Sequence, residues 1–381
     1  MPEISGLGVY VHVPFCASRC GFCVFYKEPP TRPAMERYLQ CLRKEWQRKE
    51  GQGAGADTLF FGGGTPGVLT PHDFVRVTEA LGIGITWQPR EWTVEFSPST
   101  VKREKLTILH ELGATRISLG VQSFDECTLV ALGRRQTTQQ SLRAYELLRE
   151  FSFSVNLDMM FHIPGQSLSS WMADLRMAVA LGPDHISTYC LTGECGTPVG
   201  DGLHESWSLS GEKFYRQTWN FLRDKGFEHY EISNFARDGH RCQHNCNTWR
   251  MGEWLGLGPS AASQCRGRRF RNVDDLALWA QMEEQGLAAE EDIVFLTKFL
   301  LLQDRMIFGL RTADGFDECL LSRAEELGVA DCGKLFQRWQ EMGFVKKFAG
   351  NICPTERGML VHDTLALEIL SQSTFPFVSN T

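Results

Sequence analysis

The sequence lacks a long apolar segment. No run of apolar residues approaches the roughly 20 needed to span a bilayer. Residues 1–4 show neither the basic region nor the apolar core of a secretory signal. Internal repeats and low-complexity stretches are also missing. These patterns favour a cytoplasmic protein whose contact with membranes is at most peripheral.

The chain also lacks an excess of positive charge. Its 381 residues include 39 Lys and Arg against 46 Asp and Glu, which gives a formal net charge of −7. Because proteins that follow a phosphate backbone are normally basic on at least one domain, we expect no nucleic-acid partner. Hydrophobic residues make up 43% and charged residues 22% of the chain, an ordinary globular mixture that excludes a disordered or fibrous protein.

Cysteine, in contrast, is plentiful. The chain has 13 cysteines, an odd number, and no secretory signal. In a reducing compartment, clustered thiols serve as metal ligands or small buried side chains rather than as disulfides. We expect those outside the clusters discussed below to fill the core: Cys41, Cys127, Cys190, Cys195, Cys265, Cys319 and Cys332.

Short β-rich runs alternate with segments of helical length over the first 200 residues. The runs cover 8–13, 57–61, 92–96, 116–121, 154–161 and 185–191. The clearest helix is 33–49, where apolar residues recur at spacings of three and four. This alternation predicts parallel β/α units, either as a partial barrel or as a doubly wound sheet. In both, ligands gather at the C-terminal ends of the strands.

The pattern divides the chain into three regions. We predict a β/α core over 1–200, a connecting region over 201–291 and a C-terminal domain over 292–381. Within the last, helix 333–342 followed by strand-like residues on both sides of Ala349–Asn351 resembles a winged helix. The net charge of that helix is too low for a recognition helix that binds in a DNA groove, so we expect a structural or partner-docking role.

Cys16, Cys20 and Cys23 form a C-x-x-x-C-x-x-C loop directly after the first predicted strand. Thiolates are soft, anionic ligands that suit iron–sulfur clusters or zinc. A structural zinc would need a fourth ligand, and His12 and Cys41 are awkwardly spaced for that role. Three thiolates suit a [4Fe–4S] cluster with one open iron, which the amino and carboxylate groups of S-adenosylmethionine (SAM) could bind.

This loop resembles the signature of the radical SAM enzymes. Gly62-Gly63-Gly64-Thr65-Pro66 follows the second strand, where glycines would let backbone amides approach a ligand. Further segments are similar to the coproporphyrinogen oxidase-like (HemN-like) radical SAM family across nearly the whole chain: 10–16, 117–124, 230–236, 244–249 and 255–259. The resemblance implies an α/β fold, a partial (β/α)6 radical SAM barrel with a C-terminal α+β winged-helix-like domain.

Two groups within this family differ beside the cysteine loop. The oxygen-independent coproporphyrinogen III oxidases have a fourth cysteine two residues after the third, and a long N-terminal extension. Here that position is Phe25, and 15 residues precede Cys16. Both features resemble the HemW-like haem chaperones, which carry haem to an acceptor protein. The alternative is a radical SAM oxidase acting on porphyrinogen propionates, with a SAM-dependent methyl-transferring relative as a third possibility, so enzymatic activity stays open.

The resemblance implies a set of site residues and partners. Cys16, Cys20 and Cys23 would ligate the cluster, and His244 would ligate haem. A reductant protein such as a flavodoxin would supply electrons. The positions that match SAM or substrate contacts are Tyr10, Phe22, Gly63, Gly64, Thr65, Glu95, Gln122, Arg134, Asp158 and Thr192.

Some of these residues also have a plain structural interpretation. Glu95 could cap a short helix through Ser97 instead of binding a ligand. Asp158 lies in mid-strand and needs a partner, either Arg134 or a ligand, because an unpaired buried carboxylate is costly. The histidines and cysteines of 240–246 could bind zinc or haem iron, although spacing alone favours a hydrogen-bonded loop.

Three positions depart from the family pattern. Thr248 stands where the H-N-x-x-Y-W motif has tyrosine, and His162 stands where glycine is usual. The usual Arg-x-His reads Arg134-Arg135-Gln136. Cys353 precedes a proline in the predicted wing, and we assign it to that wing rather than to haem.

Overall fold

The computed structural model describes residues 6–53, 55–192, 197–199, 211–327 and 332–371. Residues 1–5, Cys195 and residues 372–381 lie outside them. The central element is a twelve-stranded sheet that contains six parallel strands in chain order. These are β1 (Gly8–Val13), β2 (Thr58–Gly63), β3 (Glu91–Phe96), β4 (Arg116–Gln122), β5 (Ser154–Phe161) and β6 (His185–Cys190).

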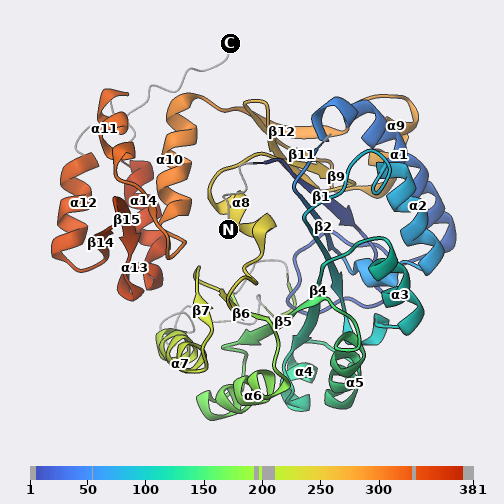
Figure 1. Ribbon diagram of the computed structural model, residues 1–381, viewed down its shortest axis with the longest axis horizontal. Helices are drawn as coiled ribbons and strands as arrows, with labels where there is room; N and C mark the ends of the chain where they lie inside the picture. Colours follow the sequence, from blue (N-terminus) through green and yellow to red (C-terminus); the bar gives the residue numbers. More distant parts are fainter. Residues whose placement is uncertain (1–5, 54, 193–196, 200–210, 328–331, 372–381) are drawn as a thin grey trace.

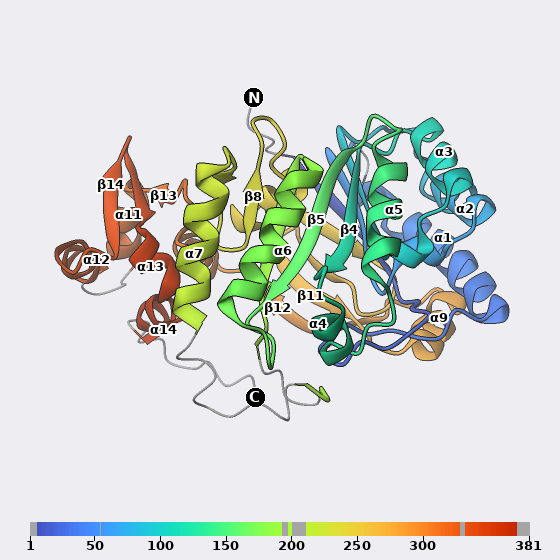
Figure 2. The ribbon, with the colours of Figure 1, turned by 90° about the horizontal axis from the view of Figure 1, so that it is seen from below.

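The helices between these strands cover the outer face of the sheet (Figures 1 and 2). They are α1 (Arg32–Gly53), α2 (Pro71–Leu81), α3 (Arg103–Glu111), α4 (Glu126–Ala131), α5 (Thr138–Leu148) and α6 (Leu168–Leu181). Strands in consecutive order are typical of a barrel, since a doubly wound sheet reverses its order partway. The predicted α/β fold and its barrel form are therefore confirmed, and the barrel is partial because, among the described residues, the strand order runs from β12 to β7 without closing on itself.

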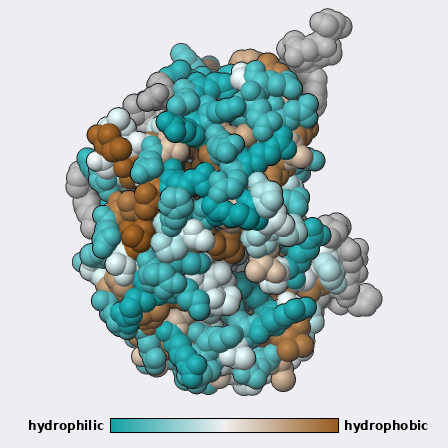
Figure 3. All heavy atoms as spheres, turned by 90° about the vertical axis from the view of Figure 1, so that its right-hand side faces the viewer, coloured by the Kyte–Doolittle hydropathy of each residue, from teal (hydrophilic) through white to brown (hydrophobic). Residues whose placement is uncertain are grey.

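Helix α1 shows how the sequence pattern produces the packing. Its apolar stripe, at Met35, Tyr38, Leu39, Leu42 and Trp46, is at most 5% exposed. The opposite side of the helix is charged, as expected of a helix that covers a sheet. The face of the molecule that carries α1, α2 and α9 is largely hydrophilic, with separate hydrophobic patches (Figure 3).

The region predicted as a connection extends the sheet at both ends. Strand β9 (Trp254–Leu257) pairs in parallel with β1, and the antiparallel strands β10 (Ala262–Cys265), β11 (Arg268–Asn272) and β12 (Glu290–Phe295) follow it. At the other end, β8 (Asn234–Ala236) and β7 (Glu228–His229) continue from β6. The helices of this region are α7 (Gly211–Asp224), α8 (Gln243–Trp249) and α9 (Leu276–Glu284).

The C-terminal part has a hydrophobic core of its own, which runs from Phe299 to Ile369. Its elements are α10 (Lys298–Gly309), β13 (Phe316–Asp317), α11 (Cys319–Glu326), α12 (Cys332–Glu341), β14 (Val345–Phe348), β15 (Asn351–Pro354), α13 (Glu356–Leu360) and α14 (His362–Ser371). Ala349 and Gly350 both have positive φ, as a tight hairpin turn requires. The predicted helix and hairpin are confirmed, while the winged-helix assignment stays an expectation.

The isolated cysteines only partly behave as core residues. Cys41, Cys265 and Cys332 are buried, as predicted, and Cys190 is half-buried. Cys127 and Cys319 are exposed, so the prediction is wrong for both. Each lies in the first turn of a short helix, α4 or α11, on the side that faces solvent. No described helix is both long and apolar enough to cross a membrane.

Candidate cofactor site and the helix at the opposite end of the barrel

The loop with the three clustered cysteines leaves the C-terminal end of β1 and is tied down on two sides. Cys16 N–H donates to the carbonyl of Glu28 at 3.0 Å, which closes the base of the loop. At its tip, Gly21 N–H donates to the carbonyl of Leu132 at 3.0 Å, and Val199 N–H donates to the carbonyl of Gly21. The loop is therefore closed at its base by Glu28 and fixed at its tip to the end of α4.

The donors in this loop fit an iron–sulfur cluster better than a zinc ion. Burial raises the pKa of the Cys16 and Cys20 thiols, and Cys16 Sγ lies 3.2 Å from the hydroxyl of Thr65. His12 is not free to be a fourth ligand, because its ring nitrogens contact the Tyr10 hydroxyl and the Tyr26 carbonyl, both at 3.1 Å. In the described part of the chain no three His, Cys, Asp or Glu side chains converge on a metal position. The loop thus supplies three soft ligands without a preformed four-ligand site.

The glycine segment after β2 packs directly on the start of the cysteine loop. A Cβ atom on Gly64 would lie 2.6 Å from the carbonyl oxygen of Phe15, and one on Gly63, whose φ is +100°, would lie 2.6 Å from the His12 ring. The amides of Gly64 and Thr65 already donate to the carbonyls of Val13 and Phe15. In this structure the amides of Gly64 and Thr65 are thus bonded within the protein, and the glycines allow this segment to pack closely on the cysteine loop.

Glu95 lies under this glycine segment. Its carboxyl is next to Gly62 and accepts a hydrogen bond from the amide of Gly63. Burial, with the charge of Asp158 nearby, raises the pKa of Glu95 to about 8. The alternative interpretation as a helix cap is wrong, because the turn Pro98–Thr100 has Ser97 at its N-cap and no side-chain cap. Glu95 instead faces the barrel interior, where it can receive a cationic group.

Asp158 also faces the interior, but its partners differ from those expected. It accepts hydrogen bonds from Ser118 Oγ and Asn156 Nδ2, both at 2.8 Å. Burial raises the pKa of Asp158, opposed by these bonds and by Arg116. Of the two partners that the sequence left open, a ligand or Arg134, the arginine is not among these hydrogen-bond partners of Asp158 in the described structure.

Arg134 lies beside the cysteine loop instead. Its guanidinium is 6.0 Å from the ring of Phe22, and its charge opposes the rise in the pKa of Cys20 that burial causes. Gln122, the last residue of β4, is 7% exposed and has a positive φ. The structure thus forms two groups at the C-terminal ends of the strands, one around Cys20 and one around Glu95.

Sequence reasoning missed Arg116, which starts β4. It is 4% exposed, and its Nε has no hydrogen-bond partner among the described residues. Its charge lowers the pKa of Asp158 and of Glu95, so its guanidinium lies near the same interior groups. The feature of the sequence that could have identified Arg116 is an arginine at the start of an otherwise apolar strand.

The other histidine and cysteine group lies at the opposite end of the barrel, on α8. His244 Nδ1 is 2.9 Å from the hydroxyl of Thr58, and its ring packs on Phe60 and against Gly8. Glu91 accepts hydrogen bonds from the amides of Gln243 and His244. Gly8, Thr58 and Glu91 are the first residues of β1, β2 and β3, whereas the cysteine loop follows the last residue of β1.

His244 is therefore not brought together with the other predicted site residues. It is 6% exposed, and burial lowers its pKa to about 4, so the imidazole is neutral at pH 7. The neighbouring His240 contacts Ser154, and Cys242 contacts Glu91. These contacts match the hydrogen-bonded loop that spacing favoured.

The tryptophan of the same motif points the other way, to the C-terminal part. Trp249 lies 4.6 Å beneath the guanidinium of Arg311 and 6.0 Å from the ring of Phe308. Thr248, the departure from the family tyrosine, donates its hydroxyl to the carbonyl of His244. Helix α8 thus bridges the start of the barrel strands and α10.

The second departure has a backbone explanation. His162 has φ +58°, the left-handed region in which glycine is free of strain, and this accounts for the usual glycine. Its ring lies 3.7 Å from Cys190 Sγ at the C-terminal ends of β5 and β6.

Comparison with known proteins agrees with this geometry. Residues 10–178 match the radical SAM superfamily. The chain is 32% identical to the haem chaperone HemW of Escherichia coli over 80% of this chain and 85% of that one. It is 33% identical to the mitochondrial radical S-adenosyl methionine domain-containing protein 1 of Mus musculus, over 81% and 73%.

Among solved structures, the coproporphyrinogen III oxidase HemN of Escherichia coli has the same fold, with a TM-score of 0.82 and 23% identity over 97% of this chain and 91% of that one. The radical SAM domain implies a [4Fe–4S] cluster and SAM as cofactors, and the three thiols of the loop fit that cluster. The chain belongs to the HemW family of radical SAM proteins.

Proposed function

We propose that this protein is a haem chaperone, which binds haem and transfers it to an acceptor protein. The observation that carries the proposal is the similarity to HemW over most of both chains. Phe25, at the position of the fourth cysteine of the oxidases, supports it further. It is 61% exposed beside the cysteine loop and offers no ligand. We also propose a cytoplasmic location, a reductant such as a flavodoxin, and at most peripheral membrane contact.

The cofactor residues have separate roles in this proposal. Cys16, Cys20 and Cys23 hold the cluster, which when bound supplies an electron and one open coordination position. Glu95 receives the cationic end of SAM, and Phe22 with Arg134 forms the wall beside the cluster. Further contacts to SAM or substrate are proposed for Tyr10, Gly63, Gly64, Thr65, Gln122, Asp158 and Thr192.

The experiment that tests the proposal compares carrier and oxidase directly. Anaerobically reconstituted protein is titrated with haemin, mixed with an apo-acceptor, and assayed in parallel with coproporphyrinogen III, SAM and reductant. We expect haem binding and transfer, with no conversion of the porphyrinogen. Turnover of coproporphyrinogen III would support the oxidase instead, and absence of haem binding would remove the chaperone proposal.

A further inference from the structure

A cleft of about 560 Å³ lies between α8, the β10–β11 hairpin and α10. Its lining includes Asn247 and Met251 from α8 and the turn after it, and Leu296 and Leu301 from the start of the C-terminal part. Figure 1 shows α8 between α10 and the strands of the sheet. The volume is within the range of sites that hold cofactor-sized ligands.

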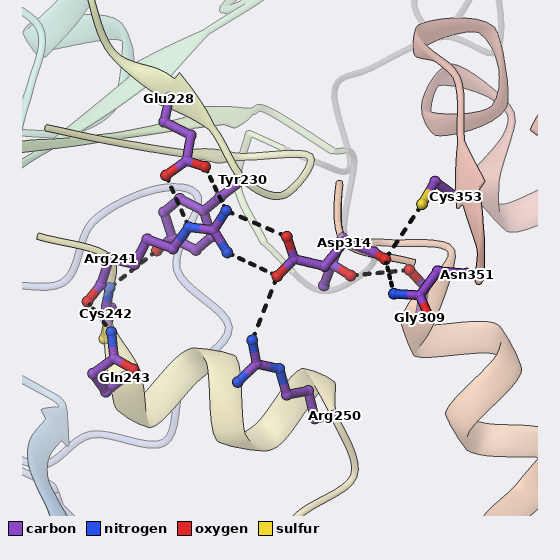
Figure 4. Close-up of polar contacts among 11 residues, drawn as sticks. Glu228, Tyr230, Arg241, Cys242, Gln243, Arg250, Gly309, Asp314, Asn351 and Cys353 are labelled. Atoms are coloured by element: carbon purple, nitrogen blue, oxygen red, sulfur yellow. Dashed lines mark hydrogen bonds and ion pairs between the residues drawn. The ribbon is translucent and has the colours of Figure 1, made fainter. Parts of the chain in front are cut away.

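Two arginines in the cleft are available to an anion. Arg305 is exposed and makes no ion pair within the described residues. Arg250 contacts Asp314 at 3.4 Å, but Asp314 is already held by Arg241 at 2.7 Å (Figure 4). A carboxylate ligand can therefore take Arg250 without leaving Asp314 unpaired. The acidic lining residue, Glu253, accepts a hydrogen bond from the amide of Arg266.

The positive charge continues along α10. A second hollow of about 380 Å³ shares Leu301 and Arg305 with the cleft, and its other charged lining residues are Lys298, Arg323 and Glu326, so three of its four charged side chains are basic. A ligand with an apolar body and carboxylates at one edge matches this arrangement of leucines and basic side chains. Arginine binds carboxylates through two parallel hydrogen bonds, which fixes their orientation.

The cleft lining contains two soft ligands for iron, the thioether of Met251 and the thiol of Cys265, and burial raises the pKa of that thiol, which disfavours its iron-binding thiolate form. Met251, which follows α8, lines the cleft and is 5% exposed. A thioether is an established axial ligand of haem iron. His244 does not line the cleft; its ring packs on Phe60, and its Nδ1 lies at the Thr58 hydroxyl. Iron bound at Met251 leaves these contacts between α8 and the barrel in place.

Resting on the proposed function, we propose that haem binds in this cleft. Its propionates contact Arg250 and Arg305, its macrocycle lies on Leu296 and Leu301, and its iron faces the sulfur of Met251. The cargo is then separated from the cofactor site by the length of the barrel strands.

The propionate contacts are tested with haemin and haemin dimethyl ester, which lacks the charges. We expect the double variant Arg250→Ala/Arg305→Ala to bind haemin at least roughly tenfold more weakly, because two charge-assisted contacts are lost. It should bind the ester as wild type does. The matched control is Arg103→Ala/Arg216→Ala, which removes two exposed arginines paired with Glu150 and Glu212 far from the cleft.

The iron contact is tested by absorption spectra of the haemin complexes of Met251→Leu and His244→Gln. We expect a changed spectrum in Met251→Leu, which keeps the side-chain volume, and an unchanged one in His244→Gln. The reverse result would assign the iron to His244 and overturn this part of the proposal. Equal haemin affinity in the double variant and the wild type would contradict the proposal that haem binds in this cleft. A wild-type protein that binds no haem would instead contradict the proposed function itself.

Discussion

Glu95 illustrates how burial sets the charge state of a single residue in the barrel interior. Its carboxyl is enclosed under the glycine segment and close to Asp158, and its pKa is raised to about 8. The protonated form therefore predominates at pH 7. A cation placed beside the carboxyl would favour the ionised form again and lower the pKa.

This gives a prediction about the pH dependence of SAM binding. Because SAM is cationic and Glu95 must lose its proton to pair with it, binding should release a proton below about pH 8, and affinity should rise as the pH approaches that value. Glu95→Gln, which keeps the shape, should remove most of this dependence. Calorimetry in two buffers of different ionisation heat measures the proton release. An equal release in the variant would contradict the role of Glu95.

At the residue scale, the sequence predicted those features that depend on spacing. Cys16, Cys20 and Cys23 share one loop because their separation in the chain is short. The partner of Asp158 could not be predicted, since it depends on which side chains of β4 and β5 face one another, and Ser118 occupies that place. Arg116 was missed for the same reason: its inward direction follows from the register of β4.

At the scale of elements, the glycine segment after β2 and the cysteine loop after β1 behave as one unit. Gly64 and Thr65 donate their amides to Val13 and Phe15, next to Cys16. The loop geometry that presents the thiols thus depends on a neighbouring strand end as well as on the loop residues.

We expect Gly64→Ala to reduce cluster incorporation although all cysteines remain. The added Cβ would lie 2.6 Å from the Phe15 carbonyl oxygen and 2.8 Å from its amide nitrogen, so the backbone beside Cys16 must move. Iron content and the visible absorption after reconstitution measure the loss, with the triple Cys→Ala variant as the lower limit. Gly211→Ala is the control, since its nearest contact would be an ordinary 3.6 Å. Full iron content in Gly64→Ala would contradict the packing argument.

The strands β1 to β6 were predictable because each is an apolar run closed by polar or glycine residues. The pairing of β9 with β1 was not, because β9 has only four residues and its partner lies more than 240 positions earlier in the chain. A short strand has too few residues to show a clear apolar–polar pattern in the sequence, and its position in the sheet is decided by pairing with distant segments.

At the scale of the whole molecule, two hydrophobic cores are joined by polar contacts. One core runs from Val9 to Ala289 with Met359, and the other from Phe299 to Ile369. Arg241 and Arg250 reach Asp314, whose carbonyl also accepts from Asn351 and Cys353 of the C-terminal sheet (Figure 4). This joint between the two cores therefore includes ion pairs beside the stacking of Trp249 on Phe308, and the energy of each ion pair depends on how deeply it is buried.

The deepest pair of the joint is Glu231 with Arg311, at 3.0 Å. The Glu231 side chain is fully buried and that of Arg311 is 25% exposed. Burial raises the pKa of Glu231, and Arg311 opposes that rise. Removing the arginine would leave a buried carboxylate supported only by the amide of Ser233 and the side chain of Asn234.

We therefore expect Arg311→Met to destabilise the protein by about 3 kcal/mol at pH 7, the cost of leaving one buried charge uncompensated. In the variant the pKa of Glu231 rises further above its unfolded value, so the folded state holds the proton more tightly. Stability relative to wild type is then lost as the pH rises and partly recovered at about pH 5. Urea unfolding followed by tryptophan fluorescence at both pH values measures this difference.

The control, Arg338→Met, breaks the exposed pair with Glu368 and should cost less than about 1 kcal/mol. A similar, pH-independent loss in both variants would show that the joint does not depend on the buried pair.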